Sequence, residues 1–161
     1  MNGIDLLSEF VVTGSLCGLR IDSPVGDVDR VMQGDYIDAV DGGGLVMRRD
    51  YGLMEFGFNS DSEFGWVLKG CGIQLHRLPY SPDLLEELRN DMGIDFQPYT
   101  TWGELSQGVS HRGGGSLEVS DQDTFLKYRM PSTKVSVIVN NVKEERDDYV
   151  GYGDVWAVHL G

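Results

Sequence analysis

The sequence predicts an α+β fold in a single domain, residues 1–161. We expect one twisted, mainly antiparallel sheet of about five to seven strands, with two or three helices packed on one face. Three observations predict this class. Apolar residues alternate with period two through the middle and the last third of the chain. Polar and glycine-rich turns separate these stretches, as in a meander. Helical spacing is confined to a few short segments.

Three segments have the spacing and end signals of helices, namely residues 3–12, 23–34 and 81–92. Ser23 and Ser81 are the predicted caps of the second and third segments, and a proline follows each of them, as suits a first helical turn. Thr101 and Glu104 have the spacing of a capping box, which predicts one further short helix.

The predicted strands occupy residues 45–49, 52–58, 66–69, 71–78, 134–142 and 152–160. Three of them show clean alternation, which predicts one buried face. In each of these strands three residues are expected to share a face: Met54, Phe56 and Phe58 in the first, Val135, Val137 and Val139 in the second, and Trp156, Val158 and Leu160 in the third. Residues 94–131 have no clear period, with strand content expected only around 117–119.

The crowded stretch Arg48–Gly52 is predicted to be the end of a hairpin. Its Asp-Tyr-Gly end suits a tight turn in which Gly52 supplies a positive φ. The three histidines, His76, His111 and His159, have no metal-ligand spacing, and His76 is expected to be solvated. Neither triple-glycine stretch has the form of a phosphate loop. The sequence therefore predicts no cofactor, no metal and no catalytic residue.

The charge is the most unusual bulk property. The chain has 13 basic and 26 acidic residues, which gives a formal net charge of −13. Residues 1–80 carry 12 acids and 6 bases, and residues 81–161 carry 14 and 7. The acidity is thus spread along the chain. Direct binding to nucleic acid is not expected, because that affinity depends on cations that neutralise phosphates.

Two acidic segments that contain aromatic residues are predicted to bind a partner protein, by attraction to a basic surface. Tyrosine beside clustered acids is a residue type that suits an interface with a cationic protein. The predicted binding residues are Asp35, Tyr36, Asp38 and Asp41 in the first segment, and Glu144, Glu145, Asp147, Asp148, Tyr149 and Tyr152 in the second.

Three stretches between residues 16 and 78 follow an order with a known counterpart. They read GLRIDSPVGDVDRVMQGDYID, then LVMRRDYGLMEFGF, then GIQLHRL. This order resembles a pattern in small, poorly characterised bacterial proteins, some of which look like immunity proteins encoded beside secreted polymorphic toxins. The resemblance implies non-enzymatic toxin binding, and it carries over no functional residue.

The leading hypothesis is therefore a cytoplasmic binding protein that neutralises a basic toxin by blocking its active cleft. We expect no membrane association, because no apolar run approaches the ~20 residues that a spanning helix needs. Two alternatives remain open. One is a small hydrolase or transferase with a Cys–His or Asp–His site assembled in space, from Cys17 or Cys71 for example. The other is an assembly subunit.

Overall fold

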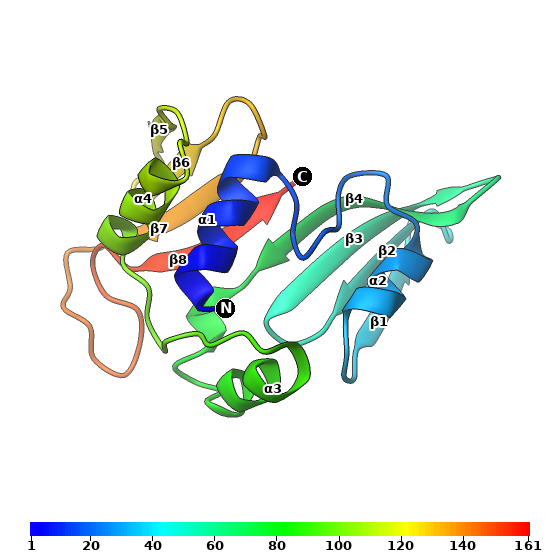
Figure 1. The fold of residues 1–161 in the computed structure, drawn as a ribbon, viewed down its shortest axis with the longest axis horizontal. Helices are drawn as coiled ribbons and strands as arrows, with labels where there is room; N and C mark the ends of the chain where they lie inside the picture. Colours follow the sequence, from blue (N-terminus) through cyan, green and yellow to red (C-terminus); the bar gives the residue numbers. More distant parts are fainter.

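Two antiparallel meanders form one eight-stranded sheet (Figure 1). The computed structural model describes residues 1–161. The strand order is β1-β2-β3-β4-β8-β7-β6-β5, and β4 joins β8 through three residue pairs, Cys71–Leu160, Gly72–His159 and Ile73–Val158. The strands are β1 Ile37–Asp41, β2 Val46–Asp50, β3 Met54–Asp61, β4 Gly65–Ile73, β5 Glu118–Asp121, β6 Phe125–Arg129, β7 Ser136–Asn140 and β8 Val155–Leu160.

The helices gather on one side of this sheet. Figure 1 shows α1 and α4 in front of the half formed by β5 to β8, and α2 in front of β1 to β3, while α3 lies along the lower border. Their bounds are α1 Gly3–Thr13, α2 Val25–Val31, α3 Asp83–Met92 and α4 Trp102–His111, with a 3-10 turn, η1, at Leu75–Arg77. The opposite face of the sheet, called the outer face below, has no helix over it.

The core lies between the helices and the inner face of the sheet. The predicted alternation is confirmed for Met54, Phe56 and Phe58, and for the three valines of the 135–139 stretch, all of which are buried. Leu7 and Phe10 of α1 meet them as fully buried side chains. Burial of large apolar side chains at this interface is the main source of stability.

The α+β class and the antiparallel sheet are as predicted, but the strand count is wrong, because the sheet has eight strands. The unexpected strand is β6, whose five residues are all half-buried and so show no alternation. The two strands predicted at residues 66–69 and 71–78 are joined in one strand, β4, whose pairing with β3 contains a register shift. Beyond Ile73 the chain forms η1 in place of the expected strand. Four α-helices are present, where two or three were expected.

The predicted helices all form, although two caps differ from expectation. Thr101 and Glu104 make both halves of the capping box at the start of α4. Ser23 does not cap α2, because its hydroxyl accepts a hydrogen bond from the Arg20 N–H at 3.0 Å. Ser81 does not cap α3 either, because Pro82 occupies the cap position and no side chain caps the helix. Gly93 ends α3 in the left-handed conformation, as its position predicts.

Candidate functional site

The outer face has a low centre, because small residues lie opposite one another across its strands. Gly57 of β3 pairs with Gly70 of β4, and Gly72 pairs with His159 of β8. A Cβ on Gly70 would lie 2.8 Å from the Leu160 carbonyl oxygen, so β8 can approach β4 only at a glycine. The outer face is thus hollowed where the two meanders join.

A groove of about 610 Å³ lies on the outer face beside this junction. This volume is in the range of small-ligand pockets, roughly 300–1,000 Å³. Five of the nine lining residues are apolar, and none is acidic. They are Gln74, Thr124, Phe125, Ile138, Asn140, Val142, Trp156, Ala157 and His159.

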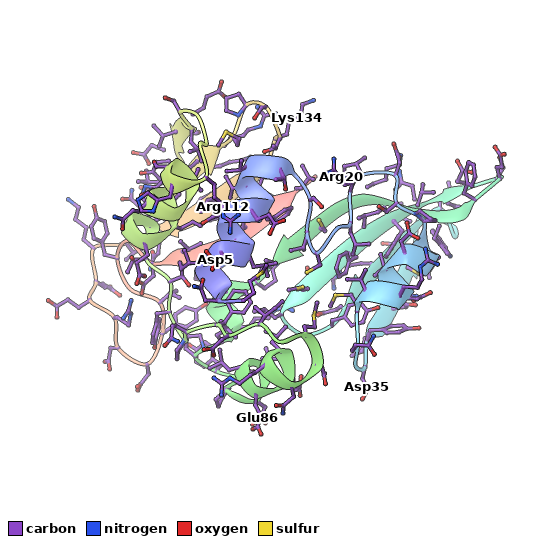
Figure 2. All side chains as sticks on the ribbon, viewed as in Figure 1. Asp5, Arg20, Asp35, Glu86, Arg112 and Lys134 are labelled. Atoms are coloured by element: carbon purple, nitrogen blue, oxygen red, sulfur yellow. The ribbon has the colours of Figure 1, made fainter.

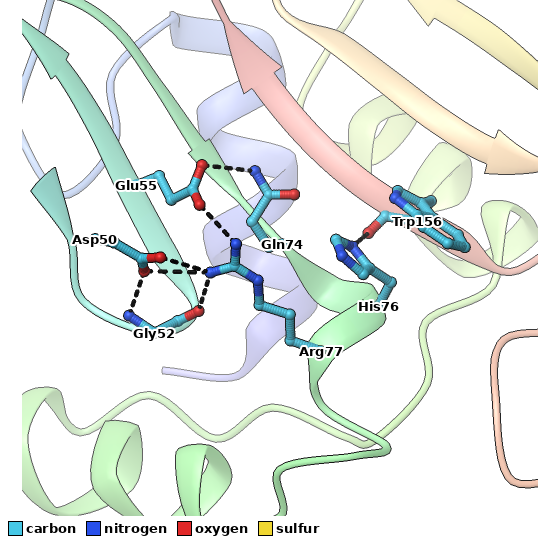
Figure 3. Close-up of polar contacts among 7 residues, drawn as sticks. All are labelled: Asp50, Gly52, Glu55, Gln74, His76, Arg77 and Trp156. Atoms are coloured by element: carbon cyan, nitrogen blue, oxygen red, sulfur yellow. Dashed lines mark hydrogen bonds and ion pairs between the residues drawn. The ribbon is translucent and has the colours of Figure 1, made fainter. Parts of the chain in front are cut away.

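Trp156 reaches the groove because β8 contains a bulge. Ala157 pairs with Ile138 and Val155 pairs with Val139, so Trp156 is the extra residue and leaves the alternation. The prediction that Trp156 shares a face with Val158 and Leu160 is therefore wrong. Its indole stacks on the His76 ring at 4.4 Å between centroids with 13° between planes (Figure 3).

His76 is half-buried in this stack, which corrects the expectation of a solvated histidine. Its Nδ1 lies 3.3 Å from the Trp156 carbonyl oxygen. Burial lowers the pKa of His76 below its ordinary value, so the ring is largely neutral at pH 7. The neutral imidazole, stacked on the indole, therefore helps to hold Trp156 in place.

Arg77 organises the polar border of the outer face (Figure 3). Its Nη1 donates to the Gly52 carbonyl at 2.7 Å and to both Asp50 oxygens at 3.2 Å, and its Nη2 donates to Glu55 at 2.6 Å. Gln74 Nε2 reaches the other Glu55 oxygen at 3.4 Å. The guanidinium thus locks the hairpin between β2 and β3, and the crowded stretch Arg48–Gly52 is a structural feature.

The first acidic segment is partly used by the fold. Arg49 is only 6% exposed, and it donates to Asp38 at 2.8 Å and to Asp29 of α2 at 2.6 Å. The Tyr36 ring covers its guanidinium at 4.0 Å. Asp41 accepts a hydrogen bond from the Gly42 N–H in the turn after β1. Among the four predicted residues of this segment, Asp35 has a carboxylate without such a contact.

The second acidic segment lies in the connection between β7 and β8, residues 141–154, called the acidic loop below. Its anchor is Asp154, 2% exposed, which accepts from Arg146 Nε and Nη2 at 2.9 and 2.6 Å and from the Gly151 N–H at 2.8 Å. The hydrogen bonds that Arg146 donates to Asp154 raise the pKa of Arg146. The Arg146 guanidinium also lies 4.1 Å from the centre of the Tyr99 ring. The loop is therefore closed and held against the domain.

The four carboxylates of the acidic loop take no part in the hydrogen bonds of this anchor. Glu144, Glu145, Asp147 and Asp148 are exposed, and none makes an ion pair, because Arg146 is taken by Asp154. Tyr149 is half-buried between Tyr80 and Trp156, at 4.8 and 5.5 Å between ring centroids. Tyr152 is exposed.

The structure does not bring the two acidic segments together. Figure 1 shows β1 at one end of the sheet and the acidic loop at the other, and Figure 2 places Asp35 at the end that carries β1. The acidic loop instead adjoins the groove, because Val142 and Trp156 line the groove beside the two ends of the loop. Sequence reasoning missed the groove, since the bulge that exposes Trp156 has no sequence signal of its own.

Cys71 is buried and Cys17 is half-buried. Desolvation raises the pKa of Cys17 to about 11 and that of Cys71 to about 12, so little thiolate forms at neutral pH. Histidine, cysteine and acidic side chains do not gather in groups of three or more that could hold a metal ion. The helices are all too short or too polar to cross a membrane.

Comparisons with known proteins assign this chain to no family. No protein-family model and no curated protein matches the chain. A solved structure is similar over most of its length: a DUF4309 family protein from Bacillus subtilis subsp. subtilis str. 168, at 15% identity, with 97% of this chain and 93% of that chain covered and a TM-score of 0.46. The resemblance to immunity proteins has no support from these matches.

Proposed function

We propose that the protein is a non-enzymatic binding protein that captures a basic partner protein with the acidic loop. We further propose that it acts in the cytoplasm as an immunity protein, in which the loop enters and blocks the active cleft of a toxin. The observation that carries the proposal is the anchored loop, in which four exposed carboxylates lack ion pairs while the single arginine is held by Asp154.

An anchored loop favours binding for two physical reasons. Less conformational entropy is lost on association when the contact residues are already ordered. Like charges held close together also create a strong local field, which speeds the encounter with a basic surface at low salt. Exposed Tyr152 beside these acids offers aromatic contact area at a low entropic cost.

The test compares two variants with equal changes in net charge. The loop variant carries Glu144→Lys, Glu145→Lys, Asp147→Lys and Asp148→Lys. The control variant carries four reversals at exposed acids that make no ion pair, Glu63→Lys, Glu86→Lys, Glu87→Lys and Asp91→Lys (Glu86 is labelled in Figure 2). Each is immobilised and used to capture proteins from cells of the source organism.

We expect wild type and control to retain the same protein and the loop variant to lose it. With the purified partner, the loop variant should associate about tenfold more slowly than the control at low salt. Equal association of both variants at every salt concentration would refute the role of the loop. Undiminished toxicity of the captured partner in the presence of this protein would refute the immunity function alone.

A second candidate function, self-assembly, is favoured by one observation at the opposite end of the sheet. The edge strand β1 is exposed along its whole length, with Ile37 76% and Val40 56% exposed. Exposed apolar edge strands can pair between chains, although Asp38 and Asp41 oppose this by charge. Sedimentation of wild type and of Val40→Lys at rising protein concentration tests this function. Assembly through β1 predicts oligomers of wild type that Val40→Lys weakens, whereas a monomer in both cases excludes it.

A further inference from the structure

The groove differs in charge from the rest of the molecule. Acids outnumber bases two to one in the chain, yet none of the nine residues that line the groove is acidic. Its walls are the indole of Trp156 and the side chains of Phe125 and Ile138. A flat aromatic or aliphatic body would be desolvated well between such walls.

Basic side chains border this groove on the outer face. Strand register places Lys127 of β6, Ile138 of β7 and Ala157 of β8 in one row across the sheet. The neighbouring row contains Arg129, Ser136 and His159. Lys127 and Arg129 therefore lie on the face that the groove occupies, on the strand next to its floor.

Lys127 has no acidic partner within the chain. Of the four lysines only Lys69 makes an ion pair, with Asp22. Lys127 is half-buried. Burial of His159 lowers the pKa of that histidine, and the charge of Lys127 lowers it further. In a protein with twice as many acids as bases, a half-buried lysine without a carboxylate leaves a position for an external anion.

Two further polar groups of the groove have free hydrogen-bonding capacity. The ring nitrogens of His159 make no hydrogen bond within the chain, and the Thr124 hydroxyl makes none either. Asn140 differs, because its Nδ2 donates to the Val150 carbonyl at 3.2 Å and its Oδ1 accepts from the Val142 N–H at 3.0 Å. A hydroxyl and an imidazole N–H can each donate to an anion, so both groups can serve a ligand near Lys127.

We propose that the groove binds a small carboxylate with an aromatic or aliphatic body, whose apolar part lies against Trp156 and Ile138 and whose anionic end lies toward Lys127 and His159. This site goes beyond the proposed function: it involves no protein partner and none of the four carboxylates of the acidic loop. Its occupant is a small anion, whereas the acidic loop is proposed to bind a cationic protein.

The test uses three probes with the same ring and different charges: indole-3-acetate, indole-3-acetamide and tryptamine. Titrations of the wild-type protein are followed at pH 7 and constant ionic strength by calorimetry and by NMR of backbone amides and the Trp156 indole. We expect the acetate to bind about threefold to tenfold more tightly than the acetamide, as for one partly exposed charge-assisted contact. Tryptamine should bind most weakly.

Matched variants locate the site. Lys127→Gln should remove the preference for the acetate over the acetamide, whereas Lys134→Gln should keep it, because Lys134 lies in the turn at the other end of the β6–β7 hairpin (Figure 2). Ala157→Leu places a larger side chain on the groove floor and should weaken all three probes. Thermal unfolding verifies that each variant is folded, and Lys127→Gln serves the test if Ala157→Leu does not fold.

Equal affinity for all three probes, or tightest binding of tryptamine, would overturn the anionic specificity. Absence of binding at probe concentrations up to about 5 mM would overturn the proposal. The groove would then be a candidate contact for a segment of a protein partner. None of these outcomes depends on the capture experiment, so the two proposals fail separately.

Discussion

The anchor of the acidic loop allows a quantitative test by replacement of Arg146 with alanine. The change leaves the Asp154 carboxylate, 2% exposed, with the Gly151 N–H as its remaining donor. Removal of one partner of a buried ion pair costs about 3–5 kcal/mol, because the other charge stays buried and uncompensated. The Arg146 side chain is itself partly exposed, so we take the lower end, about 3 kcal/mol.

The companion change Asp154→Asn should cost less. An asparagine oxygen can still accept from the Gly151 N–H, and a partly exposed Arg146 can be solvated, so we expect about 1–1.5 kcal/mol. The double variant should be more stable than Arg146→Ala alone, since it contains no buried charge without a partner. This order of stabilities distinguishes an electrostatic anchor from simple packing.

Urea unfolding, followed by tryptophan fluorescence, measures these differences. A cost of about 3 kcal/mol changes the unfolding equilibrium by about 150-fold. Amide exchange of residues 147–152 should accelerate in Arg146→Ala, while the amides of β7 and β8 stay protected. The reasoning is refuted if Arg146→Ala lies within about 0.5 kcal/mol of wild type, or if the double variant is no more stable than the single one.

Three more predictions concern the other half of the sheet and the thiols. Arg49→Met should destabilise the fold by about 2 kcal/mol in urea unfolding, because Asp38 and Asp29 lose their donor but can be rehydrated. Gly52→Ala should cost about 1–2 kcal/mol by the same assay, because φ is +96° and a Cβ would lie 2.7 Å from Leu84. At pH 8, native thiols should react with iodoacetamide about a hundredfold more slowly than unfolded thiols, since burial raises the pKa of Cys17 from 9.0 to about 11. The stability that the protonated thiols contribute is complete below pH 9 and is lost as pH rises toward 11, which unfolding at increasing pH would show.

The fold class could be predicted because the core depends on local patterns. Alternating Met54, Phe56 and Phe58 bury one face of a strand wherever that strand lies in the sheet. The capping box of Thr101 and Glu104 likewise satisfies N–H groups within its own helix turn. Such signals depend on neighbours in the sequence, so they survive without knowledge of the tertiary structure.

The features that define the candidate sites depend on distant residues. Trp156 leaves the alternation of β8 because of its pairing with β7, and the sequence of β8 alone does not contain that register. Arg77 was missed as the partner of Asp50 and Glu55, because these two acids come to face each other only through the register of the β2–β3 hairpin. The acidic loop was found from composition, and its anchor at Asp154 was not.

Trp156 also links the two proposed sites through direct contact. Its indole lines the groove, and the edge-on ring of Tyr149 from the acidic loop packs against it at 5.5 Å. A carboxylate bound against Trp156 and a protein bound over Tyr149 would therefore act on the same pair of rings. Coupling between two binding sites is reciprocal, so indole-3-acetate must change partner affinity by the factor by which the partner changes indole-3-acetate affinity. A factor that Tyr149→Leu reduces to one would assign the coupling to this contact, and a factor of one in the wild type would show that the rings are too rigid to transmit it.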